Sequence, residues 1–463
     1  SSKCDYGRCP WADAGVMDVD ITHPGLISAV ETLAAASPPL TIRVGGSLCD
    51  IISYNVTAAD ATRCAKDFSL DNSSHLGYAL KGPCLQMKRW AQLNQLCAHP
   101  NCRLAFGLNG LAGRRLAAPC AAGTNCKWTN PPPKCCTTWE GDWDPTNALS
   151  LMRHAKATGT TPFAFELGNE IAGPKGIEAK NLDPAQYGRD VDTLASVIAS
   201  VWTSPKGDAD APPPKVVAYD SSYVDGYVRA LLNATRSIDI LTSHAYSLGA
   251  GAHPDDVFRH ATSTATLDAT ASEYLATASA VAQAPGPKRP VPWVGEAGGA
   301  YNSGAPTVTD AFVSNFWYLD ALGNAAVHGF GGWCRQTLVG GNYSLLSTDT
   351  FVPHPDYYAA LLWRTLMGST VLSARQGPPA VPALRTYAHC SPPRAGANPT
   401  SRGDVTVLLL NMASNALTVE LGIENAARSE NTTREVWLGE ASPAGLRASA
   451  VLFNGILAQG AAV

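Results

Sequence analysis

Two glutamates stand at the ends of apolar runs that have the composition of buried strands. Glu170 ends FAFELGNE, and Glu296 ends PWVGE. In a parallel α/β barrel the catalytic side chains lie at the carboxyl ends of the strands. Two carboxylates that meet there about 5 to 5.5 Å apart could act as the acid and the nucleophile of a retaining glycosidase. The alternative, that either glutamate makes a salt bridge at the barrel mouth, stays open. We expect Glu166, which lies inside the first run, to form an internal hydrogen bond or ion pair rather than to act as the acid.

Other hydrolytic chemistries have little support in the sequence. It contains no GxSxG, no HExxH and no CxxC motif, which disfavours a serine hydrolase, a zinc protease and a zinc ribbon. Its glycine pairs lack the spacing of a phosphate-binding loop. We interpret these pairs as tight turns or as places where the backbone approaches a ligand closely.

The two glutamates belong to a chain in which short apolar runs alternate with stretches of helical spacing, an order that is typical of a parallel sheet. Seven runs are predicted strands: 41–46, 103–109, 163–170, 215–220, 238–246, 292–299 and 327–335. The intervening stretches 85–97, 185–202 and 308–323 are predicted helices. Seven strands are one short of a (β/α)₈ barrel, and an open sheet would leave two edges exposed. We therefore expect the first barrel strand to lie upstream of residue 1.

The pattern changes after the Pro-rich stretch near residue 380. Short alternating runs such as DVTVLLLNM, ALTVELGI and REVWLGE follow each other without helices between them, which indicates antiparallel strands. The predicted domains are a catalytic barrel over residues 1–380 and a partial β-sandwich over residues 381–463. We expect further sandwich strands to come from outside this segment.

The cysteines and sequons favour a secreted or cell-surface protein. Of 13 cysteines, 11 precede residue 137, and such density without metal-binding spacing favours disulfides formed in an oxidising compartment. Asn55, Asn72, Asn233 and Asn431 are candidate glycosylation sites. No apolar stretch approaches the roughly 18 to 20 residues of a membrane span. The Cys-rich segment 113–144 follows a predicted strand, and it is either a rim of the substrate cleft or a surface loop stiffened by disulfides.

Longer motifs resemble those of a known family. FELGNE, VGEAGGAYNSG and CRQTLVGGNYSLL are similar to motifs of the heparanase-like glycoside hydrolases, in particular the plant-type β-glucuronidase branch. The resemblance runs along the chain, through KCDYGRCPW, LTIRVGGSLCD, WEGDWD and TFVPHPDYYAALLWRTLMG. It implies an α/β fold, a (β/α)₈ TIM barrel with a small antiparallel β-sandwich, and double displacement without a metal or nucleotide cofactor.

The same resemblance assigns roles to individual residues. It implies that Glu170 is the acid/base and Glu296 the nucleophile, with Asn169 on the sugar 2-hydroxyl, Asp50 on hydroxyls at the far side of the ring and His244 behind the site. The implied contacts of the C6 carboxylate are Tyr246, Tyr301, Asn302, Ser303, Gly341 and Tyr343. The expected disulfides are Cys64 with Cys84 and Cys334 with Cys390. Asn342, in the sequon within GGNYS, is expected to be unmodified because a glycan would crowd the cleft.

The charge balance bears on the substrate. A net charge of -4 without basic runs disfavours polyanion binding, nucleic acid included. It favours an unsulfated glucuronide, from a cell-wall proteoglycan or a small molecule, over heparan sulfate. Arg43 and Arg335 are expected to pair with carboxylates inside the barrel. Two alternatives remain open: a catalytically silent structural or carbohydrate-binding glycoprotein, partnered in an extracellular assembly, and a retaining β-glycosidase for a neutral sugar. The expected location is extracellular, at the cell surface or wall, or in the vacuole.

Overall fold

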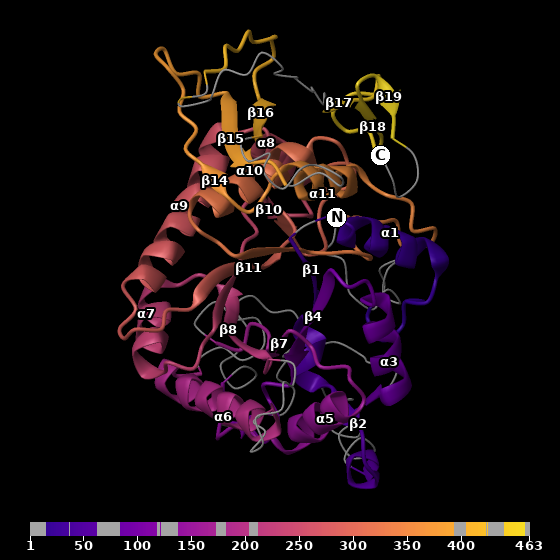
Figure 1. Ribbon diagram of the computed structural model, residues 1–463, viewed down its shortest axis with the longest axis vertical. Coiled ribbons are helices and arrows are strands. Elements are labelled where there is room, and N and C mark those ends of the chain that lie inside the picture. The colour runs from indigo at the N-terminus through magenta and orange to yellow at the C-terminus, as the bar shows by residue number, and fades with distance from the viewer. Residues whose placement is uncertain are drawn as a thin grey trace.

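The protein was analysed as a computed structural model, shown in Figure 1. The structure describes residues 15–36, 38–62, 84–117, 121, 138–172, 182–202, 212–392, 404–422, 424 and 439–458. Helices surround a central parallel sheet in these ranges (Figure 1). They are α1 (Pro24–Ala34), α3 (Met87–Leu96), α5 (Thr146–Ala157), α6 (Pro184–Trp202), α7 (Asp225–Ala234), α8 (Pro254–Ala261), α9 (Thr264–Ala282), α10 (Ser314–Val327) and α11 (Pro355–Leu366).

The central sheet has seven parallel strands and curves into a nearly closed barrel. The strands are β1 (Leu40–Val44), β4 (Cys102–Leu108), β7 (Ala164–Leu167), β8 (Lys215–Ser222), β9 (Ile240–His244), β11 (Val291–Ala297) and β13 (Gly332–Arg335). They are hydrogen-bonded in this order. Each predicted barrel strand is confirmed, because a parallel strand covered on both faces is nearly continuous in apolar residues. All residues of β7 and β9, for example, are buried.

The helices cover the sheet with amphipathic faces. In α6 the buried side chains Tyr187, Val191, Leu194 and Ile198 recur every three or four residues, the spacing that places them on one side of a helix. The carboxylate of Asp183 accepts hydrogen bonds from the first backbone amides of this helix and so caps it. Each large apolar side chain buried in this way stabilises the fold by about 1.5–3 kcal/mol.

The helix before the first strand of the sheet, α1, contacts the helix after its last strand, α11. The Tyr357 hydroxyl of α11 donates to the carbonyl of Ala29 in α1 at 3.0 Å. The Arg364 guanidinium donates to the carbonyl of Leu33 at 2.7 Å. These contacts bring α1 and α11 together.

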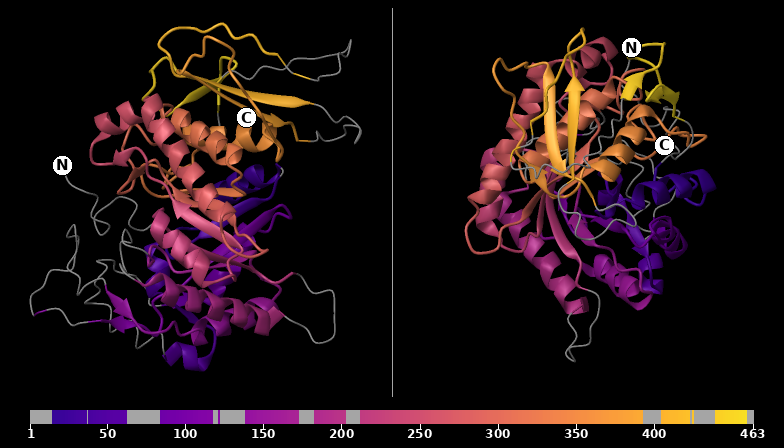
Figure 2. Two further views of the ribbon diagram at one scale, coloured as in Figure 1. Left: turned by 90° about the vertical axis from the view of Figure 1, so that its left-hand side faces the viewer. Right: turned by 45° about the horizontal axis from the view of Figure 1, so that its top comes forward.

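Antiparallel strands lie on one side of the barrel, beyond α10 and α11 (Figure 2). One sheet consists of β14 (Val371–Leu372), β15 (Leu384–Cys390) and β16 (Val405–Asn411), and another of β17 (Gly439–Ala441), β18 (Val451–Phe453) and β19 (Ile456–Leu457). Because β14 already belongs to this part, the domain boundary near residue 380 stays a prediction. The predicted strand ALTVELGI is wrong over its described residues 416–422, where the chain is irregular and mostly exposed. Its alternating pattern therefore has no buried face.

Short elements complete the loops around the barrel. They are the 3₁₀ turn η1 (Ser47–Ile51) and the two-stranded pairs β2 (Ser53–Asn55) with β3 (Cys84–Gln86), β5 (Arg115–Leu116) with β6 (Trp139–Glu140), and β10 (Gly249–Ala250) with β12 (Ala300–Tyr301). The strands β5 and β6 belong to the Cys-rich segment 113–144. Most of the remainder of that segment, residues 118–120 and 122–137, lies outside the described residues.

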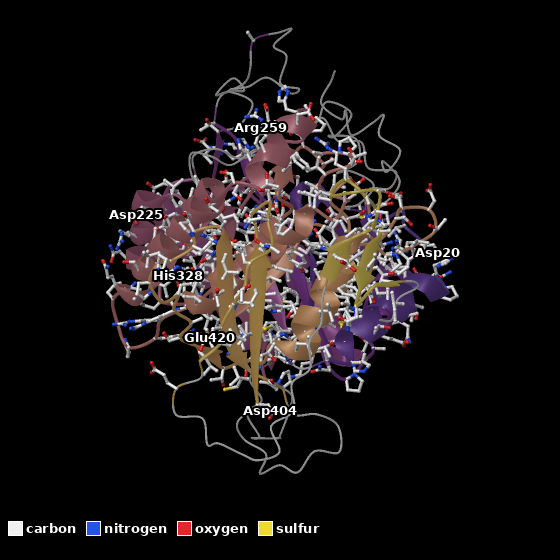
Figure 3. The ribbon with its side chains drawn as sticks, turned by 90° about the horizontal axis from the view of Figure 1, so that it is seen from above. Asp20, Asp225, Arg259, His328, Asp404 and Glu420 are labelled. Carbon is white, nitrogen blue, oxygen red and sulfur yellow. A yellow bond between two sulfur atoms is a disulfide. The ribbon has the colours of Figure 1, made fainter. Side chains whose placement is uncertain are left out.

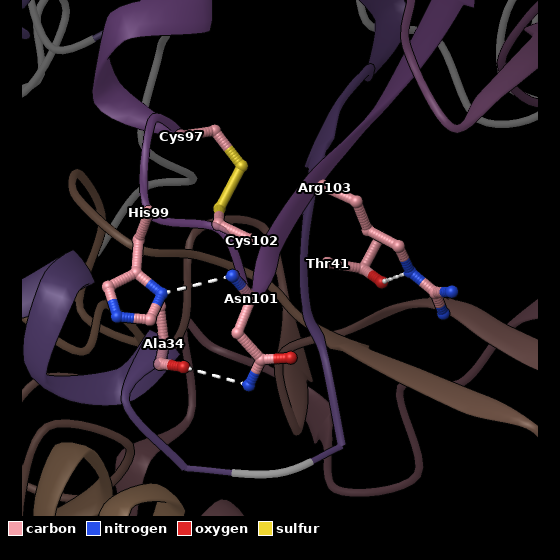
Figure 4. Close-up of a disulfide and its surroundings, with 7 residues drawn as sticks. All are labelled: Ala34, Thr41, Cys97, His99, Asn101, Cys102 and Arg103. Atoms are coloured by element: carbon pink, nitrogen blue, oxygen red, sulfur yellow. Dashed lines mark hydrogen bonds between the residues drawn. A yellow bond between two sulfur atoms is a disulfide. The ribbon is translucent and has the colours of Figure 1, made fainter. Parts of the chain in front are cut away.

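A disulfide joins Cys97, which follows α3, to Cys102, the first residue of β4 (Figure 4). The predicted bond between Cys334 and Cys390 is wrong, since both thiols are free. Cys334 belongs to β13 of the barrel, whereas Cys390 ends β15 of the antiparallel sheet. Cys84 is disulfide-bonded. Cys64, its predicted partner, lies outside the described residues.

The candidate glycosylation sites differ in their surroundings. Asn233 is exposed on α7. Asn55 is half-buried, and its amide donates to the side chain of Gln86 at 2.8 Å. Asn72 and Asn431 lie outside the described residues. Glycosylation therefore stays a prediction.

Charges are distributed around the outside of the molecule. Figure 3 shows the acidic residues Asp20, Asp225, Asp404 and Glu420 at separate places around its outline. None of the helices in the described ranges combines the length and the apolar character needed to cross a membrane.

Candidate active site

A cavity of about 1450 Å³ opens at the carboxyl ends of the barrel strands. Its lining includes every predicted catalytic and substrate-binding residue except Asp50: Asn169, Glu170, His244, Tyr246, Glu296, Tyr301, Asn302, Ser303, Gly341 and Tyr343. The parallel topology explains this grouping, because parallel strands deliver the residues that follow them to one end of the barrel.

Glu170 lies just beyond β7 in a strained backbone. Its φ is 54°, and Gly168 before it has a φ of 75°. A Cβ at Gly168 would come within 2.4 Å of the Ile171 side chain, so this turn requires glycine. The Glu170 amide donates to the carbonyl of Asp220 at 2.8 Å. This hydrogen bond fixes the position of the Glu170 backbone, from which its side chain extends.

The two carboxylate oxygens of Glu170 have different surroundings. Oε1 lies 2.8 Å from Nδ1 of His244, whereas the buried Oε2 has no hydrogen-bond partner among the described residues. Burial raises the pKa of Glu170, although the hydrogen bond with His244 opposes the shift. A buried carboxyl with a raised pKa and one free oxygen can hold a proton and deliver it into the cavity.

Glu296, on β11, is held at both oxygens. The Tyr246 hydroxyl donates to Oε1 at 2.5 Å, and the Arg43 guanidinium donates to Oε2 at 3.0 Å. Burial and the neighbouring Glu296 raise the pKa of Tyr246 well above its usual value, which keeps the phenol protonated as a donor. These two donors stabilise a carboxylate.

The two glutamates face each other closely. One carboxylate oxygen of each, together with one nitrogen of His244, lie within 4.8 Å of one another. So close an approach of the two oxygens fits the carboxyl pair of retaining glycosidases, about 5 to 5.5 Å apart, better than the roughly 6.5–9.5 Å of inverting enzymes. The arrangement can therefore bring a proton donor and a nucleophile to the same bond.

Asp50 lies beneath the cavity rather than in its lining. Its exposed fraction is 1%. Its two oxygens accept backbone hydrogen bonds from Gly110 and Asn169, each at 2.9 Å. The structure therefore places Asp50 as a support for the main chain of Asn169, in contrast to its predicted contact with sugar hydroxyls.

Arg43 lies at the centre of a buried charged cluster. Its guanidinium bonds Glu166 at 2.8 Å, Asn169 at 2.9 Å and also Asp220. With Glu296, it thus meets three carboxylates. The internal ion pair predicted for Glu166 is confirmed. Arg335 also pairs with a buried carboxylate, that of Asp356, at 2.6 Å.

Two loops that follow β12 and β13 hold the remaining predicted residues of the cavity lining. Asn302 and Ser303 have φ values of 59° and 68°, which turn the backbone after β12. The Asn342 amide donates to the Ser303 carbonyl at 2.7 Å and joins this loop to the segment that holds Gly341 and Tyr343. Tyr246 was predicted to act with this group, but its hydroxyl contacts Glu296 instead.

The trio Glu170, His244 and Glu296 also has the residue types of a metal site. Both His244 nitrogens, however, already face carboxylates, Nδ1 that of Glu170 and Nε2 that of Asp220 at 2.7 Å. Asp220 and Glu296 raise the pKa of His244 well above its usual value, although burial opposes this. A protonated imidazole has no lone pair for a cation, so the cluster does not fit a metal ion.

Asp220 is the residue that sequence reasoning missed. Its carboxylate bonds both His244 and Arg43. Although burial opposes it, these two neighbours lower the pKa of Asp220 to about 2. The signal was present, because Asp220 ends the predicted strand KVVAYD as the glutamates end theirs.

Comparison with known proteins identifies the family of the chain. The model of the N-terminal domain of glycosyl hydrolase family 79 matches residues 1–323. The chain belongs to this family. It is therefore a glycoside hydrolase.

Relatives in the family extend over most of the chain. Heparanase-like protein 1 of Arabidopsis thaliana is 36% identical over 94% of this chain and 73% of its own length. The baicalin-beta-D-glucuronidase of Scutellaria baicalensis is 31% identical over 89% of this chain and 72% of its own. The heparanase-like resemblance is thus confirmed.

Solved structures agree on the fold. The GH51 arabinofuranosidase from Xanthomonas axonopodis pv. citri aligns with a TM-score of 0.54 at 14% identity and covers 86% of this chain and 78% of its own. At that identity the similarity concerns the barrel fold alone.

Proposed function

We propose that this family 79 hydrolase is a retaining β-glucuronidase that works by double displacement, with Glu170 as acid/base and Glu296 as nucleophile. The observation that carries the proposal is that one carboxylate oxygen of Glu170 and one of Glu296 lie within 4.8 Å of each other at the wall of a large cavity. Among the described residues, Oε2 of Glu170 has no hydrogen-bond partner, and burial raises the pKa of Glu170. The Glu296 carboxylate is held by an arginine and a tyrosine.

The reaction has two steps. First, a carboxylate oxygen of Glu296 forms a bond to the anomeric carbon while the glycosidic C–O bond breaks and its oxygen takes the Glu170 proton. Then Glu170 removes a proton from water, whose oxygen attacks the same carbon and releases Glu296. Two inversions return the sugar with its original β configuration.

A glucuronide is favoured as substrate by the loops after β12 and β13, which line the cavity, and by the activity named for the Scutellaria relative. Backbone amides and hydroxyls near Ser303, Gly341 and Tyr343 are groups that can bind a C6 carboxylate. An unsulfated substrate is favoured because the described lining of the cavity contains one Lys or Arg side chain, Arg43, which three carboxylates already neutralise. The proposed setting is secreted or extracellular.

The test is hydrolysis of 4-nitrophenyl β-D-glucuronide followed by proton NMR. We expect the β anomer of glucuronic acid to form first, before mutarotation. First formation of the α anomer would exclude double displacement. Faster turnover of the matching glucoside or xyloside would exclude the glucuronide assignment and leave a neutral-sugar glycosidase.

A further inference from the structure

The side chain and the carbonyl of Asp220 contact three different parts of the catalytic apparatus. The carbonyl accepts the amide hydrogen of Glu170 at 2.8 Å. One carboxylate oxygen, Oδ1, lies 2.7 Å from Nε2 of His244, and the other bonds the Arg43 guanidinium. His244 in turn contacts Glu170, and Arg43 contacts Glu296. One fully buried residue is thus connected to both glutamates.

A local irregularity of the sheet gives Asp220 this position. The pairing of β8 with β9 shifts register between Ala218 and Ser221, and Tyr219 and Asp220 have φ values of 85° and 39°. A bulge of this kind redirects a side chain that regular alternation would place elsewhere. Positive φ at two neighbouring residues that are not glycine is costly, and such strain is concentrated at functional sites.

The neighbouring strand leaves room for this carboxylate. A Cβ at Gly295, the residue before Glu296, would lie 2.9 Å from Oδ1 of Asp220 and 2.8 Å from the Thr242 side chain. Any larger residue there would have to displace one of them. Gly295 in the Val-Gly-Glu sequence therefore leaves space for the Asp220 side chain, next to Glu296.

We propose that Asp220 is a positioning residue that couples the two catalytic glutamates, by holding His244 against Glu170 and Arg43 against Glu296. The inference rests on the proposed function. When Glu170 gives up its proton, the imidazolium of His244 stabilises the carboxylate that forms, and Asp220 keeps that imidazole charged and oriented. When the bond between Glu296 and the sugar breaks, the electron pair returns to the Glu296 carboxylate, and the Arg43 guanidinium stabilises that carboxylate.

The charged groups around His244 determine what loss of Asp220 would do. They are Asp220 from β8, Glu170 after β7 and Glu296 from β11, with Arg43 behind Asp220. Removing the Asp220 charge lowers the pKa of His244 and weakens the positive charge beside Glu170. Glu170 then holds its proton to higher pH and donates it less readily.

The test compares Asp220→Asn with Asp190→Asn. Asp190 is a matched control because it is also buried and paired with an arginine, Arg114, at 2.6 Å, outside the cavity lining. For Asp220→Asn we expect kcat/KM to fall about 10- to 100-fold and its alkaline limb to move up by about one pH unit. The loss should be greater for phenyl than for 4-nitrophenyl β-D-glucuronide, because the poorer leaving group needs the proton more.

Two results would overturn the proposal. One is a folded Asp220→Asn protein whose pH profile superimposes on that of the wild type after scaling. The other is an alkaline limb of the His244→Gln profile that does not move. Glutamine keeps the hydrogen-bonding capacity of histidine without its charge, so this result decides the question if Asp220→Asn does not fold. Asp190→Asn should lose stability only, with an unchanged profile.

A separate readout distinguishes this inference from the proposed function. Nitrogen-15 NMR of labelled histidines, with the His244 signal assigned by its loss in His244→Gln, follows protonation without substrate. We expect His244 to titrate at lower pH in Asp220→Asn than in the wild type, and equal titration would refute the coupling. If the wild type hydrolyses no glucuronide but this shift is present, the proposed function fails and the link between Asp220 and His244 stands.

Discussion

Two clusters of charged side chains in this molecule contain the same residue types but differ in how completely their carboxylate oxygens are hydrogen-bonded. At the barrel mouth, Arg43 meets Glu166, Asp220 and Glu296. Where α9 and α10 meet the antiparallel sheet, Arg385 of β15 bonds the buried Asp320 of α10 at 2.8 Å and the exposed Asp268 of α9 at 2.7 Å. A tyrosine hydroxyl donates to a carboxylate in each, at 2.5 Å. Composition alone does not tell them apart.

The difference lies in what is left unpaired. Both oxygens of Asp320 are occupied, one by Arg385 and Tyr387 and the other by Asn324. At the barrel mouth, Oε2 of Glu170 has no partner among the described residues, and the backbone there is strained at Glu170 and Asp220. A saturated cluster joins two parts of the fold, whereas a cluster with one free oxygen beside a cavity can do chemistry. Matched substitutions in the two clusters test this distinction.

The largest effect is expected from Glu296→Gln. Without the attacking carboxylate, kcat on 4-nitrophenyl β-D-glucuronide should fall by more than about 10⁴-fold. The melting temperature should change less than in Asp320→Asn, because Arg43 keeps Glu166 and Asp220 as partners. Steady-state kinetics and thermal unfolding of the same preparation measure both. If the variant keeps a tenth of the wild-type activity, Glu296 is not the nucleophile.

Glu170→Ala should have the next largest effect. Loss of acid/base catalysis is expected to cost about 10²- to 10⁴-fold in kcat/KM, and more with phenyl than with 4-nitrophenyl as leaving group. Azide, which needs no base, should restore turnover and yield β-glucuronyl azide, identified by mass spectrometry and NMR. An equal loss on both substrates without azide rescue would contradict the assignment.

Asp320→Asn tests the other cluster with the same kind of change. Removing one charge from a buried ion pair should lower the free energy of unfolding by about 3 kcal/mol and leave kcat/KM within about twofold of the wild type. Chemical denaturation and kinetics at 25 °C provide the two numbers. A kinetic loss comparable to that of Glu170→Ala would mean that the two clusters do not differ in function.

The smallest effects come from a matched pair of hydroxyl deletions. Tyr246→Phe should lower kcat about 10-fold with little change in stability. Tyr387→Phe should lower stability by about 1.5–3 kcal/mol, the range for a hydrogen bond to a charged group, with unchanged kinetics. The distinction between the clusters fails if both variants affect the same property.

The barrel and its glutamates could be predicted because apolar runs and the polar residues that end them are local features. Asp220 also ends an apolar run, so its place at the barrel mouth could have been predicted. Its contacts could not, since the bulge at Tyr219 and Asp220 interrupts the alternation that sequence reasoning follows. The contact of Tyr246 with Glu296 depends on how two strands lie side by side. Cys334 and Cys390, which were predicted to pair, are free thiols, because sequence order alone does not show which cysteines the fold brings together. The strand predicted from ALTVELGI was wrong, because alternating apolar residues do not by themselves provide a neighbouring strand to pair with.

The hydrogen bond between Arg43 and Glu296 joins residues 253 positions apart, and this separation bears on how the protein acquires activity. Closing so large a loop is entropically costly and slows folding. The charges at the barrel mouth neutralise one another only when β1 and β11 are both in place. Recovery of activity during refolding should therefore lag behind recovery of helix and strand content, because hydrolysis requires the most distant contact in the site.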